Sequence, residues 1–138
     1  MSAFVARYDA LVNELRTKIR VLPHDAPESS AIELTCLWDT GAQFSVITPR
    51  IADILGLDAV DLKKAYTANG IYETPVYRLD AILPTGYRVR GLKASTGDLL
   101  VCDMLIGMDV IGCGDFLITN KGMTEFAFRI PSEGKSPL

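Results

Sequence analysis

The sequence lacks the features that define several classes of protein. Its cysteines are odd in number, lie far apart and form no Cys-x-x-Cys motif, so neither a complete disulfide framework nor a thiolate zinc site is predicted. No basic run is long enough to follow a phosphate backbone, and the net charge is −3. Nucleic acid is therefore not an expected partner. We expect reduced, mostly buried thiols at Cys36, Cys102 and Cys113.

A long apolar run is also missing from the N-terminal segment. Charged residues interrupt the stretch MSAFVARYDALVNELRTKIRV every few positions, so neither a signal peptide nor a membrane span is predicted. We infer a cytoplasmic protein with no membrane partner. The length of 138 residues and the hydrophobic fraction of 49% are typical of one compact globular domain.

Apolar residues recur every three or four positions in the first twenty residues. This spacing predicts an amphipathic helix that ends before Pro23. The turn-forming stretch PHDAPESS then predicts a linker, in which His24 is expected to be a solvated side chain without a role. We divide the chain into an N-terminal helix and linker (1–29), a main domain (30–131) and a flexible tail (132–138). The apolar residues are Phe4, Tyr8, Leu11, Leu15 and Ile19.

The main domain carries the pattern of a mainly β protein. Apolar and other residues alternate from Ile32 to Trp38, which predicts a strand that runs directly into Asp39. A cap at Thr48, a proline after it and Gly56 predict a short helix over 48–55. Further short runs separated by turn formers predict a closed β architecture. These predicted strands span 65–68, 72–83, 87–92, 99–106, 116–119 and 124–130.

Two motifs within this pattern resemble those of a known family. The stretch LWDTGAQFS (37–45), which contains Asp39-Thr40-Gly41, resembles the active-site loop of the retropepsin family of aspartic proteases. About sixty residues later, MLIGMDV (104–110) resembles the second signature of that family, an apolar strand ending in Ile106-Gly107 before a short helix. The resemblance covers residues 30–131. It implies a single-lobe retropepsin-like β-barrel of the non-viral, bacterial or cellular type, with short helices and an added N-terminal helix.

The resemblance assigns catalysis to Asp39 and support of the active-site loop to Thr40, Gly41 and Ala42. Without a metal or covalent nucleophile, peptide hydrolysis needs an acid and a base, which two adjacent carboxylates sharing one proton supply. The sequence has no second Asp-Thr-Gly or Asp-Ser-Gly, and the chain is too short for two lobes. The second aspartate must therefore come from another copy in a homodimer. We expect a peptide or protein substrate, no cofactor and no metal.

The family also has a flap, a hairpin that closes over the substrate, and residues 65–73 lie where it is expected. Asn69-Gly70 is suited to the tight tip, with Ile71 beside it. Four further residues have two possible roles: Ile71, Tyr72, Ala42 and Ile106. Each either lines the cleft or packs in the core or in the flap.

The remaining residues near the second signature have structural interpretations. Asp103 and Asp109 are of a type that ligates metals, but no histidine or cysteine cluster accompanies them, and we interpret Asp109 as a helix cap. Met108 and Trp38 are interpreted as packing residues.

The chain departs from viral members of the family at two linked positions. Those members carry an ion pair where this chain has Gln43 and Met108, and loss of both partners leaves no unpaired charge. In viral members the chain ends interleave in an interface sheet, so residues 126–130 are a candidate interface strand here.

Two other hypotheses remain open at this stage. The first is a catalytically silent, protease-like dimeric module that binds a peptide or partner and keeps Asp39 for structure. The second is an unrelated small β-protein in which Asp-Thr-Gly is a chance turn.

Overall fold

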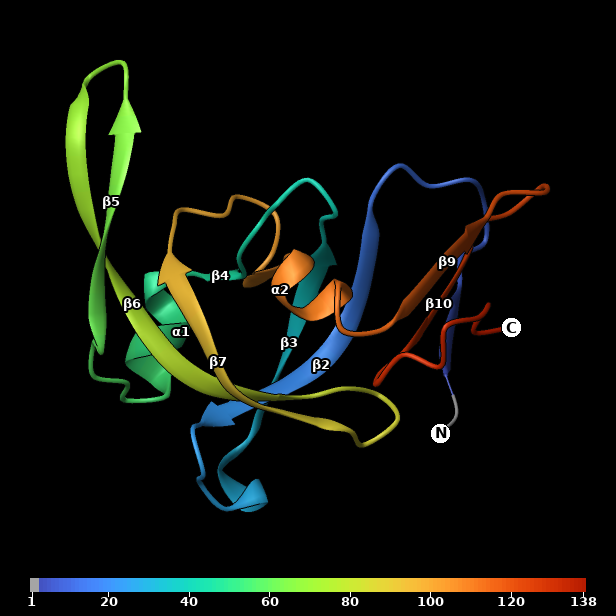
Figure 1. The fold of residues 1–138 in the computed structure, drawn as a ribbon, viewed down its shortest axis with the longest axis horizontal. Helices are drawn as coiled ribbons and strands as arrows, with labels where there is room; N and C mark the ends of the chain where they lie inside the picture. Colours follow the sequence, from blue (N-terminus) through green and yellow to red (C-terminus); the bar gives the residue numbers. More distant parts are fainter. Residues whose placement is uncertain (1–2) are drawn as a thin grey trace.

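The computed structural model describes residues 3–138 and confirms the predicted mainly β architecture (Figure 1). The strands are β1 (Phe4–Arg7), β2 (Leu15–Pro23), β3 (Ile32–Trp38), β4 (Val46–Ile47), β5 (Asp61–Thr67), β6 (Gly70–Ile82), β7 (Arg88–Thr96), β8 (Met104–Ile106), β9 (Asp115–Thr119) and β10 (Glu125–Arg129). The helices are the 3-10 turn η1 (Glu28–Ser30), α1 (Pro49–Ile54) and α2 (Met108–Ile111).

A seven-stranded sheet forms the body of the molecule, in the order β2-β3-β8-β4-β7-β6-β5. An additional pairing of β2 with β6 closes six of these strands into a ring. The ring is irregular because β4 has only two residues. Its interior is filled by fully buried apolar side chains such as Val21, Cys36, Leu79, Ala94 and Met104. Burial of these side chains is the main force that holds the ring together.

The order of the strands in the ring brings the two sequence motifs together. Strand β8 lies between β3 and β4, parallel to the first and antiparallel to the second. Trp38, the residue before the Asp-Thr-Gly motif, is therefore the direct register partner of Ile106. Two segments about sixty residues apart in sequence thus end at the same place in the sheet.

A second sheet of three strands, in the order β1-β10-β9, lies beside the ring. It packs aromatic side chains against Trp38, whose ring centroid lies 5.1 Å from that of Phe126 and 4.9 Å from that of Phe128. Since β10 is the central strand, both of its edges are paired within the chain. The hypothesis that residues 126–130 interleave with a partner is therefore wrong, because β10 has no free edge.

The predicted N-terminal helix is also wrong, because this region forms β1 and β2. Residues 15–21 of β2 pair with β3 and residues 20–23 pair with the end of β6, while β1 pairs with β10. Thr17, Ile19 and Val21 show the period of two that a strand requires. Leu11, which completed the helical spacing, lies between the strands and is exposed.

The other predicted elements are close to the observed ones. The helix over 48–55 and the strand over 32–38 are confirmed as α1 and β3, whereas the strand over 99–106 is reduced to β8. All three cysteines are free thiols, but only Cys36 is buried, so the expectation of mostly buried thiols is wrong. Within residues 3–138, no helix is long and apolar enough to cross a membrane.

Candidate active site

Asp39 follows the last residue of β3, at the point where the sheet ends. Its amide donates a hydrogen bond to the carbonyl of Ile106 at 2.9 Å, which continues the β3–β8 ladder by one step. Beyond this bond the chain leaves the sheet and turns. The ladder bond thus fixes the backbone of Asp39, and the half-buried side chain extends from this fixed position.

A tight turn follows Asp39 and is held by the aspartate itself. The amide of Gly41 donates to Asp39 Oδ1 at 2.8 Å, and the amide of Ala42 donates to the Asp39 carbonyl at 3.2 Å. A Cβ atom at Gly41 would lie 3.1 Å from the same carboxylate oxygen. Thr40 and Gly41 are both exposed at the tip of the turn. One carboxylate oxygen thus accepts a backbone hydrogen bond beside an open surface.

The second signature packs directly against this turn. A Cβ atom at Gly107 would lie 2.8 Å from the carbonyl oxygen of Ala42 and 2.8 Å from the carbonyl carbon of Phe44, so only glycine fits without a shift. The amide of Met108 donates to the Ala42 carbonyl at 2.8 Å, and that of Asp109 donates to the Gln43 carbonyl at 3.2 Å. The start of α2 therefore fixes the backbone that follows Asp39.

A buried side-chain brace adds to these backbone bonds. Ser45 is fully buried, and its amide and hydroxyl each donate to the carboxylate of Asp109 at 2.8 Å. The Ser45 hydroxyl also accepts a hydrogen bond from the amide of Gly107 at 3.2 Å. The sequence did not predict this pair, because the two residues are 64 positions apart. Asp109 is not the helix cap that was predicted: Gly107 holds that position and Asp109 lies in the first turn of α2.

The two residues that replace the viral ion pair do not form a substitute side-chain bond. Gln43 and Met108 are both exposed, and the backbone bonds from α2 make the connection between the loop and the helix. The interpretation of Met108 as a packing residue is therefore wrong. Trp38 is buried as predicted, and its indole donates to the hydroxyl of Thr17 at 2.9 Å.

A hollow of about 270 Å³ opens beside Asp39. One wall is formed by Leu37, Trp38, Asp39 and Thr40 at the end of β3. The other walls come from the loop before β2, the start of β2, and β9, and the residues there are Asn13, Glu14, Leu15, Phe116 and Ile118. The three-stranded sheet thus reaches the candidate site through β9.

The predicted flap is a long hairpin made by β5 and β6, which projects away from the rest of the molecule (Figure 1). Thr67 pairs with Gly70, so Ala68 and Asn69 form the turn and Gly70, with a φ of 126°, begins β6. The turn was predicted at Asn69-Gly70 and lies one residue earlier, at Ala68 and Asn69. Ile71 and Tyr72 are exposed on this hairpin, whereas Ile106 is buried in the core.

The base of the hairpin touches the active-site loop. The ammonium group of Lys63 on β5 lies 4.9 Å from the ring centroid of Phe44, a cation–π contact. Phe44 and Lys63 also line a mostly apolar hollow with Leu62 and Val76. The base of the hairpin is thus in contact with the loop that carries Asp39, while its tip projects away from the molecule.

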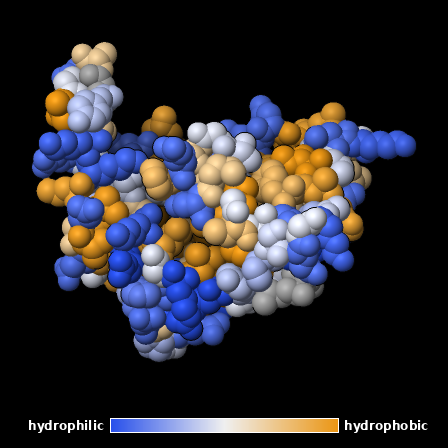
Figure 2. All heavy atoms as spheres, viewed as in Figure 1, coloured by the Kyte–Doolittle hydropathy of each residue, from blue (hydrophilic) through white to orange (hydrophobic). Residues whose placement is uncertain are grey.

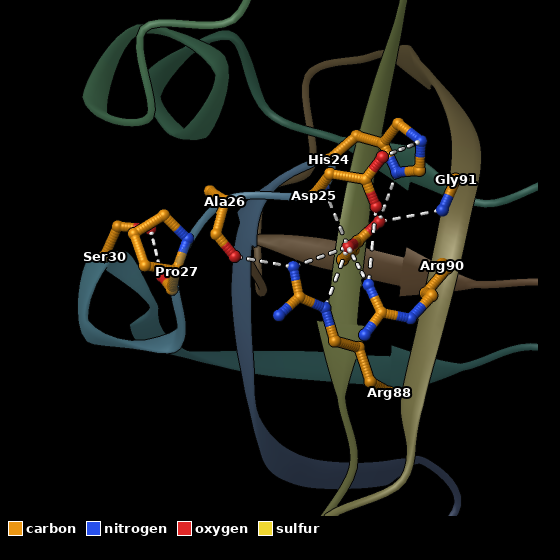
Figure 3. Close-up of polar contacts among 9 residues, drawn as sticks. His24, Asp25, Ala26, Pro27, Ser30, Arg88, Arg90 and Gly91 are labelled. Atoms are coloured by element: carbon orange, nitrogen blue, oxygen red, sulfur yellow. Dashed lines mark hydrogen bonds and ion pairs between the residues drawn. The ribbon is translucent and has the colours of Figure 1, made fainter.

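A second polar cluster surrounds the fully buried Asp80. Figure 3 labels its members His24, Asp25, Arg88, Arg90 and Gly91. Oδ1 of Asp80 is 2.8 Å from His24 Nδ1 and accepts from the amide of Gly91, while Oδ2 accepts from Arg88 Nε at 2.8 Å and from the amide of Asp25. Burial raises the pKa of Asp80, but the hydrogen bonds outweigh it and bring the pKa down to about 2.

This cluster corrects the interpretation of His24 as a solvated residue without a role. His24, Asp25 and Asp80 have ligand atoms within 4.8 Å of one another, which is a spacing that suits a metal. However, Arg88 pairs with Asp80 at 2.7 Å and Arg90 pairs with Asp25 at 3.4 Å, so cations of the protein already neutralise these carboxylates. The cluster joins the segment after β2 to β6 and β7. Asp103, the other metal-ligand candidate, pairs with Arg50 at 2.8 Å.

Comparisons with known proteins agree with this geometry. A family model described as "gag-polyprotein putative aspartyl protease" matches residues 31–112. A retropepsin-like aspartic protease from Rickettsia conorii has a similar structure, with a TM-score of 0.60 and 21% identity over 91% of this chain and 93% of that one. The EIAV protease complexed with the inhibitor HBY-793 has a TM-score of 0.51 and 17% identity over 72% of this chain and 86% of that one. No curated protein matches the chain.

The fold and the loop geometry define a protein of the retropepsin-like class, as the resemblance implied. The matched family model covers more than half of the chain, including both signatures. The chain belongs to the gag-polyprotein aspartyl protease family.

Proposed function

We propose that this protein is an aspartic endopeptidase whose catalytic dyad consists of Asp39 from each of two identical chains. The observation that carries the proposal is the position of Asp39: it directly follows strand β3, its backbone is held by Ile106, and the second signature packs against the turn behind it. A carboxylate held in this way has little freedom to move, which is what general acid and base catalysis requires.

The reaction follows from two such carboxylates placed side by side. Like charges at short distance cannot both be ionised, so the dyad holds one proton and titrates as a unit. The ionised Asp39 accepts a proton from a water molecule as the water oxygen attacks the peptide carbonyl carbon. The protonated Asp39 of the partner subunit donates its proton to the carbonyl oxygen. Proton transfer to the peptide nitrogen and cleavage of the C–N bond then release an amine and a carboxylic acid.

The residues after Asp39 have supporting roles in this proposal. Gly41 donates a backbone hydrogen bond to the carboxylate and leaves space beside it, and Ala42 connects the turn to α2. Thr40 is exposed and therefore available to the second chain, and the resemblance to the retropepsin family implies that its hydroxyl forms a hydrogen bond across the dimer. These contacts orient the dyad and do not take part in proton transfer.

The substrate is proposed to be a peptide segment in an extended conformation. The hairpin of β5 and β6 presents apolar side chains on an exposed surface, including Tyr66 at 76% and Ile71 at 62% exposure. A projecting hairpin of this kind offers both main-chain hydrogen bonds and apolar contacts to an extended chain. Residues 69–71 are thus proposed to form the part of the flap that closes on the substrate.

The decisive experiment compares wild type with Asp39→Asn in hydrolysis of a mixed peptide library from acidic to neutral pH. Since the amide cannot act as the acid or the base, we expect cleavage to fall by at least about 10²–10⁴-fold. Asp53→Asn, on the exposed surface of α1, is the matched control and should cleave like wild type. Activity that survives Asp39→Asn would overturn the mechanism. Peptide binding without cleavage in wild type would instead favour the silent module.

A further inference from the structure

A groove of about 570 Å³ lies between β1 and β2. Residues 4–8 line one side of this β1–β2 groove and residues 16–20 line the other, with further residues from the turn between β6 and β7. Of the residues that line it, none lines the hollow beside Asp39. Its volume lies within the range of about 300–1,000 Å³ that is typical of ligand sites. The groove is therefore a candidate binding site separate from the proposed active site.

Strand β1 directs an unpaired backbone edge toward the groove. Within residues 3–138, the one strand that pairs with β1 is β10. The amide of Tyr8 donates to the carbonyl of Thr124 at 3.0 Å, so the backbone at Tyr8 faces β10. Because the backbone groups of successive residues in a strand point to opposite sides, those of Val5 and Arg7 face away from β10. Both residues line the groove.

Strand β2 presents a second unpaired edge along its first half. Its last four residues pair with β6 on that side, but no strand in the described part of the chain pairs there with the five residues before them. The carbonyl of Arg16 points away from β3, because it accepts a hydrogen bond from the Tyr8 hydroxyl at 2.7 Å. Lys18, two residues further on, has the same orientation. The register agrees, since the carbonyl of its partner Thr35 accepts from the amide of Asp103 and not from β2.

A peptide that enters the groove in an extended conformation therefore meets two strand edges. It can form backbone hydrogen bonds on both sides, whereas addition to the outer edge of β5 would form them on one side. The hairpin that carries β5 also projects from the molecule, and Figure 2 shows hydrophilic and hydrophobic side chains mixed on it, at the upper left of the view. Residues 16–20 correspond to roughly 13 Å of strand, which matches an extended segment of about five residues.

The side chains around the groove indicate which peptides suit it. Four cationic side chains and one carboxylate line it: Arg7, Arg16, Lys18, Arg20 and Glu33. Each arginine pairs with a glutamate at the surface, and exposed pairs of this kind contribute little to stability. None of the ion pairs among the described residues includes the exposed Lys18. A carboxylate on the peptide would thus find a cation that is not already paired.

We propose that the β1–β2 groove binds an extended, acidic segment of another protein, about five residues long, as an added strand between β1 and β2. The amides of Val5, Arg7 and Lys18 donate to carbonyl groups of the segment, and its carboxylates lie beside the Lys18 ammonium. The added strand joins the three-stranded sheet to the ring. Since one chain supplies every residue of this site, the proposal does not depend on the Asp39 dyad.

A fluorescein-labelled peptide of three Val-Glu repeats tests the groove by fluorescence anisotropy. The measurement uses the Asp39→Asn protein, so that cleavage cannot remove the probe. We expect saturable binding with a dissociation constant below about 1 mM. A peptide of three Val-Lys repeats should bind at least about tenfold more weakly, because its ammonium groups would face cations. Methylation of alternate backbone nitrogens of the Val-Glu peptide should also weaken binding about tenfold or more, since strand addition needs these donors.

Reversal of one charge in the protein tests the position of the peptide. In Lys18→Glu, we expect the dissociation constant of the Val-Glu peptide to rise at least about tenfold. Lys121→Glu is the matched control, because it makes the same change of net charge at an exposed residue in the turn between β9 and β10. This control should bind the peptide as the parent protein does. Circular dichroism of both variants shows whether they remain folded.

Hydrogen exchange locates the added strand on the backbone. The amides of Val5 and Lys18 face the groove, so saturation with the Val-Glu peptide should slow their exchange. The amides of Ala6 and Thr17 face β10 and β3 in the alternation of the same strands, and their exchange should change little. Equal protection of all four amides would indicate general stiffening of the protein and would count against an added strand.

The outcomes separate this proposal from the proposed cleavage. No saturable binding below about 1 mM, or equal binding by Lys18→Glu and Lys121→Glu, overturns the groove as a peptide site. Protection confined to the β5–β6 hairpin or to β9 also overturns it, because the peptide then binds elsewhere. None of these results affects the comparison of wild type with Asp39→Asn in peptide hydrolysis. Binding that requires Lys18, tolerates Lys121→Glu and protects Val5 and Lys18 supports the proposal.

Discussion

At the scale of single residues, Asp39 and Asp80 show two uses of the same side chain. Asp80 has no exposed surface and takes part in four hydrogen bonds, one of them from Arg88, whereas Asp39 is half-buried and holds its own turn. The first arrangement stabilises the ionised carboxylate in one place. The second leaves Asp39 partly exposed, with a carboxylate that a substrate or partner can reach.

The buried and bonded aspartates predict how stability depends on pH. The pKa of Asp80 is lowered to about 2, and the Ser132 hydroxyl, the Glu133 amide and Arg129 likewise lower the pKa of Asp115 to about 2. Both values lie below the ordinary 3.8, so the stabilisation is fully present above about pH 4 to 5 and is lost as pH falls toward 2. We expect the free energy of unfolding, measured with urea, to decrease across this range.

A variant isolates the part that Asp80 contributes. Asp80→Asn leaves Arg88 without its carboxylate, so we expect it to lower the free energy of unfolding at pH 7 by about 1–3 kcal/mol. It should also make the dependence on pH between 2 and 5 less steep. Asp53→Asn should change neither quantity, because Asp53 is exposed on α1. Equal slopes for wild type and Asp80→Asn would contradict the assignment.

Sequence reasoning found Asp39 and missed Asp80 for a physical reason. Asp39 is marked by local context, since the strand before it and the small residues after it are neighbours in the chain. The partners of Asp80 include His24, 56 positions away, and no local pattern reports such a contact. The brace between Ser45 and Asp109 was missed for the same reason.

At the scale of elements, the outcome of prediction depended on what stabilises each segment. The boundaries of α1 are set by a proline and a glycine within the segment itself, and they were predicted correctly. The segment 4–19 is stabilised by pairing with β3 and β10, which lie elsewhere in the sequence, so its apolar spacing alone gave the wrong element. The alternation in β2 was present in the sequence but was shorter than the helical pattern that overlapped it.

The contact between Gly107 and the active-site turn predicts the effect of a single methyl group. Gly107→Ala would place a Cβ 2.8 Å from two backbone atoms that cannot rotate away, so we expect a loss of about 1–3 kcal/mol in urea unfolding and a large loss of cleavage. Gly97→Ala is the control, because the added methyl would meet only the Val46 side chain, at 3.1 Å. If both variants cleave alike, the locking role of Gly107 is wrong.

At the scale of the whole molecule, the chain is a complete fold that carries half of the proposed site. The ring of strands, the three-stranded sheet and the hairpin are all formed within one chain. In the proposed dimer, the second aspartate is supplied by the other chain. Folding and catalysis should therefore respond differently to dilution, since the first needs one chain and the second needs two.

Mixing experiments test whether the dyad is shared between chains. If wild type and Asp39→Asn are combined in equal amounts and allowed to exchange, about a quarter of the dimers contain two wild-type chains, so activity per wild-type chain should fall to about half. The control mixes wild type with Asp53→Asn and should show no such loss. A strict proportionality to the amount of wild-type chain would show that each chain acts alone.

The long strand β6 has a mechanical consequence for the hairpin. Its first residues are exposed in the projecting hairpin, while its last four, from Leu79 to Ile82, are buried where β2 and β7 hold it on both sides and Asp80 anchors it. A strand that is held at one end and free at the other can bend as a unit about the end of its held part. Bending should therefore concentrate between Thr74 and Tyr77, where burial begins, and substitutions there would adjust the stiffness of the hairpin without touching Asp39.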